Sequence, residues 1–218
     1  MESQSGLVGF LLDLPIFEAE WVLWLLLGLS LISVAIMIER YWFYATHKID
    51  TELVRRELRK LLDRGDFAGA AKYLEQFDSL ETNVVLFGLR EYGKGPDSVE
   101  DLLAGAEGKE KQRYTRRLSF LATVGSNAPF IGLFGTVLGV IKAFGELGTD
   151  MSSVGGKLMI GISEALVATG VGLLVAIPAV IAYNVYIGKV NALSANTELL
   201  SRTLLAQLKA EEPLAEAA

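Results

Sequence analysis

Three long apolar stretches, at residues 21–44, 118–147 and 158–187, constrain this chain more than any other feature of its sequence. A helix that spans a bilayer needs about 20 mostly apolar residues, and each stretch is long enough. Hydrophobic residues make up 51% of the chain and the mean hydropathy is +0.38, which is too apolar for an ordinary soluble domain. The sequence therefore predicts an all-α integral membrane protein with three transmembrane helices.

Basic residues set the expected orientation of these helices. Residues 1–20 contain four acids and no Lys or Arg, whereas residues 45–117 carry basic residues near both ends. Because Lys and Arg gather in cytoplasmic loops, the N-terminus should lie outside and the C-terminus inside. We therefore expect a short outer segment over 1–20, a cytoplasmic helical domain over 45–117, an outer loop over 148–157 and a cytoplasmic tail over 188–218.

The cytoplasmic segment is predicted to form several helices. Leucines recur at helical spacing from Leu53, and Asp66 is placed to cap a second helix. Ser98 and Asp101 fit a capping box that opens a further helix, which could run unbroken into the second span. The acids and bases of this segment nearly balance, so a solvated helical domain is expected and no nucleic-acid partner.

Small residues form a stripe along each of the last two apolar stretches. At 100° per residue, the stripe of the second stretch includes Gly125, Ala128, Gly132 and Gly139, and that of the third includes Gly161, Ala165, Ala168, Gly172 and Ala176. Small residues let membrane helices approach closely. Two interpretations stay open: the stripes pack the two helices within one subunit, or they join helices of adjacent subunits in an oligomer.

Glu164 interrupts the third apolar stretch. An ionised carboxylate in hydrocarbon is costly, so this side chain should face a cavity, pair with a partner or carry a proton. Thr169 lies on the other flank of the stripe, and Thr136 lies within the stripe of the second stretch; their hydroxyls could hold water in a narrow polar path. A simpler alternative is that Glu164 only reaches the outer membrane surface. Pro178 predicts a kink in the third helix.

Other classes of protein find little support in the residues. The chain has no Cys and one His, which makes a metal cluster implausible, and we expect no metal and no cofactor. A nucleophile–base pair typical of an enzyme is missing, and so is the inverted repeat of a secondary transporter. A structural membrane scaffold would explain the small stripes without needing Glu164. Lys142 and Glu146 are interpreted as an i,i+4 pair near the outer end of the second span.

Two stretches carry a resemblance to a known family. NAPFIGLFGTVLGVIKAF at residues 127–144 and GISEALVATGVGLLVAIPAVIAYN at residues 161–184 resemble the MotA/TolQ/ExbB proton-channel family, in its ExbB/TolQ branch. The resemblance implies a multi-pass protein of the bacterial inner membrane that forms a homopentamer with a central pore. It also implies that Thr136, Glu164 and Thr169 line that pore.

The resemblance further implies partners and a source of energy. The pore would hold two copies of a single-span protein, ExbD-like or TolR-like, and a TonB-like or TolA-like protein would carry force to the outer membrane. Protons and membrane lipid complete the expected partners. An ExbB-type subunit would energise TonB-dependent transport across the outer membrane, and a TolQ-type subunit would maintain the envelope. A flagellar-type stator is a further alternative, although such stators are usually longer and have four spans.

Overall fold

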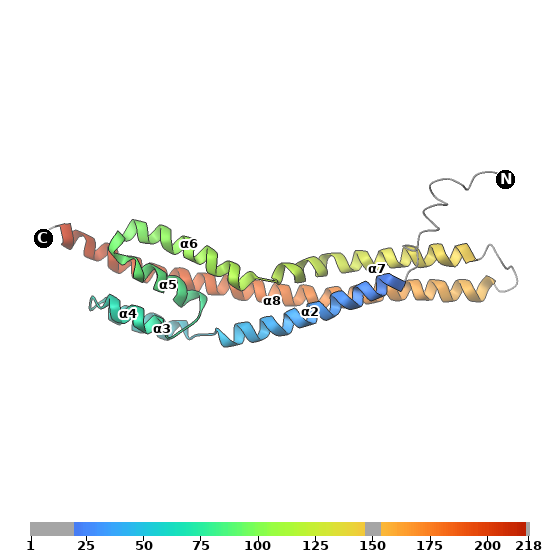
Figure 1. Cartoon of the computed structure of the whole chain (residues 1–218), viewed down its shortest axis with the longest axis horizontal. Coiled ribbons are helices and arrows are strands. Elements are labelled where there is room, and N and C mark those ends of the chain that lie inside the picture. Colours follow the sequence, from blue (N-terminus) through green and yellow to red (C-terminus); the bar gives the residue numbers. More distant parts are fainter. Residues whose placement is uncertain (1–19, 147–153, 217–218) are drawn as a thin grey trace. The chain divides into compact units, whose positions relative to one another are not determined.

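The computed structural model describes the backbone of residues 20–146 and 154–216, and the side chains of residues 20–144 and 159–210. These residues form helices and no strand (Figure 1). The elements are α2 Glu20–Thr46, α3 Thr51–Leu62, α4 Phe67–Leu74, α5 Leu80–Arg90, the short 3₁₀ helix η2 Tyr92–Lys94, α6 Pro96–Thr115, α7 Leu118–Glu146 and α8 Val154–Glu216.

Three helices in the described part of the chain are long and apolar enough to cross a membrane, and they lie in α2, α7 and α8. The predicted fold class, an all-α membrane protein with three long apolar helices, is confirmed. The segment expected outside at residues 1–20, except for Glu20, lies beyond the described residues, and so does most of the loop expected at 148–157.

The chain divides into two compact units. Unit 1 comprises residues 1–38 and 119–183, and unit 2 comprises residues 39–118 and 184–218. The helices α2 and α8 each contribute residues to both units.

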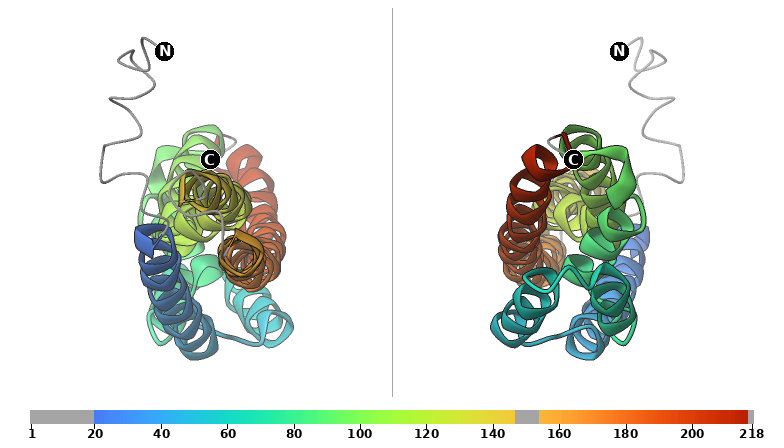
Figure 2. Two further views of the ribbon diagram at one scale, coloured as in Figure 1. Left: turned by 90° about the vertical axis from the view of Figure 1, so that its right-hand side faces the viewer. Right: turned by 90° about the vertical axis from the view of Figure 1, so that its left-hand side faces the viewer.

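Unit 1 contains the most apolar parts of the chain. Its α7 and α8 lie side by side, and α2 packs against them (Figures 1 and 2). The core combines large and very small side chains: Val22, Leu26, Val124, Ala128, Leu138, Val175, Ala176 and Ala179. Many large apolar side chains face outward instead, and Trp24 and Leu174 are each 72% exposed. A surface this apolar requires a hydrocarbon surrounding, because water would penalise it.

Unit 2 has the organisation of a water-soluble helical domain. Its shorter helices bury one apolar face each; in α3 that face consists of Val54, Leu58 and Leu62. Between α6 and α8, α5 approaches both helices closely. A Cβ built on Gly88 would lie 2.6 Å from Leu103 Cδ2 and 3.3 Å from Leu204 Cδ2. Glycine at this position therefore lets three helices share one core.

Helix ends in unit 2 follow local rules, with two departures from expectation. Asp66 caps α4 as predicted, its carboxylate accepting from Gly69 N at 2.8 Å. The capping box expected at Ser98 is wrong, because α6 begins at Pro96 after Gly95, whose φ of +84° suits a residue without a side chain. The predicted unbroken helix is also wrong: α6 ends before Arg117, whose φ is +68°, and α7 starts at the next residue.

Candidate proton-pathway site

The small-residue stripes of α7 and α8 face each other within one chain. A Cβ on Gly132 would lie 2.7 Å from the carbonyl oxygen of Ala168 and 3.2 Å from Gly172 Cα. One on Gly139 would lie 2.8 Å from Ala165 Cβ. Real Cβ atoms do not approach other atoms this closely, so only glycine permits the two backbones to meet here.

The same antiparallel contact runs along both helices. A Cβ on Gly125 would lie 2.5 Å from Val180 Cγ2, and one on Gly161 would lie 2.6 Å from Ala143 Cβ. The remaining stripe members, Ala128, Ala165, Ala168, Gly172 and Ala176, are buried. Packing within the chain thus occupies this face, and little of the stripe is left uncovered for a neighbouring subunit.

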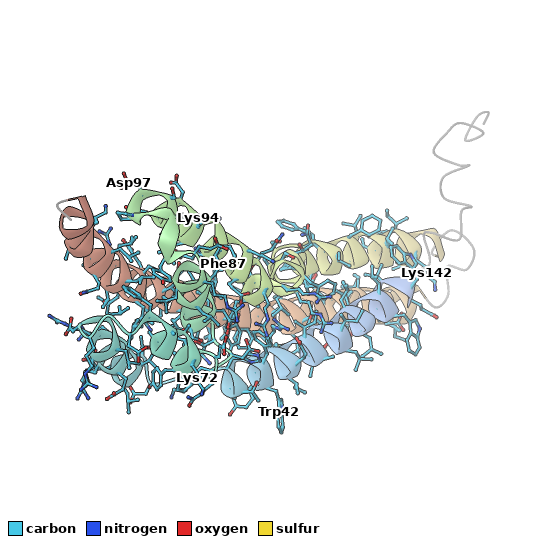
Figure 3. All side chains as sticks on the ribbon, turned by 60° about the vertical axis from the view of Figure 1, so that its left-hand side comes forward. Trp42, Lys72, Phe87, Lys94, Asp97 and Lys142 are labelled. Carbon is cyan, nitrogen blue, oxygen red and sulfur yellow. The ribbon has the colours of Figure 1, made fainter. Side chains whose placement is uncertain are left out.

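A groove of about 590 Å³ opens beside this helix pair, and Glu164 lines it. Its floor is made of small residues from both helices: Gly135, Gly139, Ala143, Gly161, Ala165 and Ala168. Two other ionisable residues line the same groove, namely Lys142 of α7 and Glu20 at the start of α2. Figure 3 labels Lys142 near the end of α7.

The groove combines opposite charges without neutralising them by direct contact. Glu164, Lys142 and Glu20 are all exposed, and no ion pair joins them among the described side chains. The groove thus places the carboxyl of Glu164 and the amino group of Lys142 in one open space at the end of unit 1 where α2 begins. No described residues form a group of three His, Cys, Asp or Glu side chains placed to hold a metal.

The two threonines lie apart from this groove. Neither Thr136 nor Thr169 is among the described residues that line it. Both are half-buried, and the hydroxyl of Thr136 donates to the carbonyl oxygen of Leu133 at 2.6 Å. Thr169 belongs to the close contact with Gly132, where its Cα would lie 3.1 Å from a Cβ on the glycine. The structure places Thr169 at the contact between α7 and α8, Thr136 on α7 outside the groove, and Glu164 in the open groove.

Prolines occupy both helices of the seam. α8 is assigned as helix without interruption through Pro178, and the kink predicted there stays a prediction. Pro129 lies inside α7 and was missed in the sequence. Because a proline has no N–H, the carbonyl of Gly125 loses its helical donor, which is a second place where this pair of helices could bend.

Lys142 and Glu20 are further residues that the sequence did not assign to this site. Lys142 was paired with Glu146, whose side chain lies outside the described residues. That pairing stays a prediction. Aligning the two stripes in antiparallel order, with Gly139 against Ala165, would have shown that Lys142 and Glu164 lie along the same stretch of the helix pair. Glu20 carried no comparable signal, because its position depends on how α2 packs.

Comparisons with known proteins identify the family. The family model described as the MotA/TolQ/ExbB proton channel family matches residues 47–199. A putative biopolymer transport protein ExbB-like 2 of Helicobacter pylori is 33% identical over 164 residues, covering 75% of each chain.

Relatives named Tol-Pal system protein TolQ also match the chain. The one from Haemophilus influenzae is 33% identical over 194 residues, covering 80% of this chain and 81% of its own. The one from Pseudomonas aeruginosa is 46% identical over 96 residues, covering 42% of each chain. The matched range contains α3 to α7 and most of α8, including the groove residues Lys142 and Glu164. The chain belongs to the MotA/TolQ/ExbB proton channel family, within its ExbB/TolQ branch.

Proposed function

We propose that this chain is the channel subunit of a proton-driven motor in the bacterial inner membrane, and that with an ExbD-like partner it energises TonB-dependent transport across the outer membrane. The observation that carries the proposal is Glu164, an acid on an otherwise apolar part of α8 that opens into a groove with Lys142. An intramembrane acid in a polar groove marks a proton or ion path by default.

The orientation inferred from the basic residues gives this path a direction. With the N-terminus and the loop at 148–157 in the periplasm, the groove opens toward the periplasmic side. Glu164 lies ten residues after the start of α8 and Thr169 fifteen, which is about 15 and 22 Å along the helix. Protons would reach Glu164 first, and Thr136 and Thr169 would hydrate the next part of the path. Each charge that crosses 100 mV releases about 2.3 kcal/mol.

The proposal includes an assembly. Five copies would surround a pore that holds two copies of the ExbD-like single-span protein, and a TonB-like protein would transmit force. The separation of Glu164 from the threonines within one chain supports an assembly, because a continuous polar lining then needs side chains from a neighbouring copy or a partner.

A TolQ-type role is the second candidate. The relatives named TolQ and ExbB match this chain with equal identity over most of its length. In that case the same motor would work with TolR-like and TolA-like partners to maintain the envelope, and Glu164 would keep its role.

The test of the channel function is Glu164→Gln, which keeps the shape of the side chain and removes the titratable proton. We expect energy-dependent uptake, or envelope maintenance, to fall at least about tenfold, the factor that 1.4 kcal/mol represents. Glu164→Asp should restore part of the activity, because it keeps the carboxyl and withdraws it by one methylene. Glu57→Gln, at a half-buried residue of α3 in unit 2, is the matched control. Unchanged activity in the Glu164→Gln strain, with normal protein levels, would contradict the proposal.

The two systems are separated in a strain that lacks the gene. Growth would be recorded with a ferric siderophore or vitamin B12 as the limiting nutrient, with detergent sensitivity measured in parallel. Lost uptake with an intact envelope indicates the ExbB-type role. Normal uptake with detergent sensitivity and chained cells indicates the TolQ-type role.

A further inference from the structure

Unit 2 has an open groove between α3 and α8 that no residue of the proton path uses. Its volume is about 360 Å³, and it is lined by Arg55, Arg59, Leu62, Asp63, Leu199, Arg202, Thr203, Ala206 and Gln207. Leu199 is 45% exposed, which is unusual for a leucine on a water-facing helix. The groove therefore joins an apolar strip with a cationic wall.

Each arginine of this wall has a carboxylate partner close to it in the sequence. Arg55 pairs with Glu52 at 2.8 Å, and Arg202 pairs with Glu198 at 2.7 Å. Arg59 has a weaker partner in Asp63 at 3.9 Å. All three pairs join residues three or four positions apart and are in contact with solvent, so they are weak and readily exchange partners. Three guanidinium groups against one carboxylate in the lining favour an acidic occupant.

An acidic helix face of matching kind lies on the same unit. Asp97, Asp101, Gly105 and Gly108 follow one another at helical spacing on α6 and are exposed. Asp97 pairs with Lys209 of the same chain at 3.9 Å. Asp101 makes no ion pair among the described residues. A Cβ built on Gly105 or Gly108 would meet no atom within 4 Å, so another helix could approach this face closely. Figure 3 labels Asp97 at the beginning of α6.

The levels of the two surfaces match along the helices. Within the chain α6 and α8 run antiparallel: Lys209 Nζ lies 3.1 Å from Glu100 Oε2, and the hydroxyl of Ser194 donates to Glu107. By this register, Arg202 of α8 lies at the height of residues 102–104 of α6. In a ring whose rotation axis is parallel to the helices, each residue has the same position along that axis in every copy. Asp101 of one copy would therefore lie level with Arg202 of the next copy.

We propose that the groove between α3 and α8 binds the acidic face of α6 from a second copy of this chain. The arginines of one copy meet Asp101 of its neighbour, and Leu199 packs against the surface at Gly105. Each copy carries one groove and one acidic face on different helices, which is the arrangement that closes a ring instead of a two-fold dimer. The proposal rests on the assembly in the proposed function and names the surface that the copies share.

The chain has no cysteine, so engineered thiols can test the contact in native membranes. Asp101→Cys and Arg202→Cys chains with different tags would be produced together and treated with a short bismaleimide, whose span replaces the two long side chains. We expect a covalent dimer that carries both tags. Either variant alone should give none, since residue 101 of one copy does not meet residue 101 of the next. Arg202→Cys produced with Lys72→Cys, a residue on α4, is the control for random collision.

A second pair of variants tests the same contact in case the cysteine substitutions disturb folding. Arg202→Asp should weaken the assembly at least tenfold in detergent, and adding Asp101→Arg should restore it. Loss of the two-tag dimer while a general amine cross-linker still reports oligomers would overturn this surface and leave the proposed function standing. If no oligomer forms with any reagent, both fail. Cross-linking of Arg202→Cys to a different protein would also overturn the proposal.

Discussion

Units 1 and 2 both pack helices together, but they use side chains of different size at the contacts between helices. In unit 1 the closest contact, between α7 and α8, is made by glycine and alanine, and large side chains such as Trp24 and Leu174 point outward. In unit 2 leucines such as Leu58 fill the interior and charged residues cover the outside. The difference follows from the solvent: lipid gives no hydrophobic drive for helix association, so close backbone contact must replace it.

The contrast extends to the treatment of charge. In unit 2 many of the described surface acids pair with a base, as Asp78 does with Arg113 and Glu57 with Lys60. The acid in the apolar part of α8, Glu164, shares a groove with Lys142 but forms no ion pair among the described side chains. Ionisable side chains in unit 2 therefore form surface ion pairs, whereas those that line the groove of unit 1 form no ion pair with one another among the described side chains.

The largest effect should come from filling the seam of unit 1. Gly132→Leu puts a branched side chain where even a Cβ would lie 2.7 Å from the carbonyl oxygen of Ala168. The two helices would have to separate, which we expect to cost more than about 4 kcal/mol and to remove most folded protein from the membrane. Protein yield and thermal unfolding in detergent measure it.

Gly170→Leu is the matched control for that change. Gly170 is exposed on α8, and a Cβ there would meet nothing within 4 Å. It should keep normal yield and unfolding temperature. Equal loss in both variants would mean that any leucine in α7 or α8 is harmful, and the close contact would not be what holds unit 1 together.

A smaller effect is expected from emptying the core of unit 2. Leu58→Ala removes a side chain with no exposed surface, and such truncations cost about 2–5 kcal/mol. Leu53→Ala on the same helix, at a residue that is 52% exposed, should cost less than about 1 kcal/mol. Denaturant unfolding of the full chain in detergent gives both values. If the two variants lost equal stability, α3 would not pack through one face as described.

The sequence predicted the features of this organisation that depend on local rules, but not those that depend on tertiary structure. The stripes of small residues predicted a close-packing face on α7 and on α8, because spacing alone defines a helix face, but they left open whether the contact lies within one chain. Asp66 followed from a local capping rule. The break at Arg117 did not, since a positive φ is rare for arginine and has no local signal. The groove around Glu164 needed the antiparallel register and the packing of α2, both of which are properties of tertiary structure.

The smallest effect is expected from removing a surface ion pair of unit 2, which tests how much such pairs contribute to its stability. Arg113 binds both oxygens of Asp78 at 2.9 Å, and His47 Nε2 lies 3.3 Å from Asp78 Oδ2. The hydrogen bonds from Arg113 hold the pKa of Asp78 well below its usual range. Both side chains are more than a third exposed, so solvent screening reduces the pair to about 1 kcal/mol, and Arg113→Met should cost that much at pH 7.

The pH dependence of this pair has a definite sign. A carboxyl whose pKa is lowered on folding stabilises the fold above its unfolded pKa of about 3.9. That stabilisation is lost as the pH falls toward the lower folded value, so the difference between wild type and Arg113→Met should be constant from pH 5 to 7 and shrink below about pH 4. Unfolding in detergent as a function of pH measures it. If Arg113→Met lowered the free energy of unfolding by more than about 3 kcal/mol at pH 7, this ion pair would stabilise unit 2 as much as a core leucine does. The prediction that surface charge contributes only modestly to unit 2 would then be wrong.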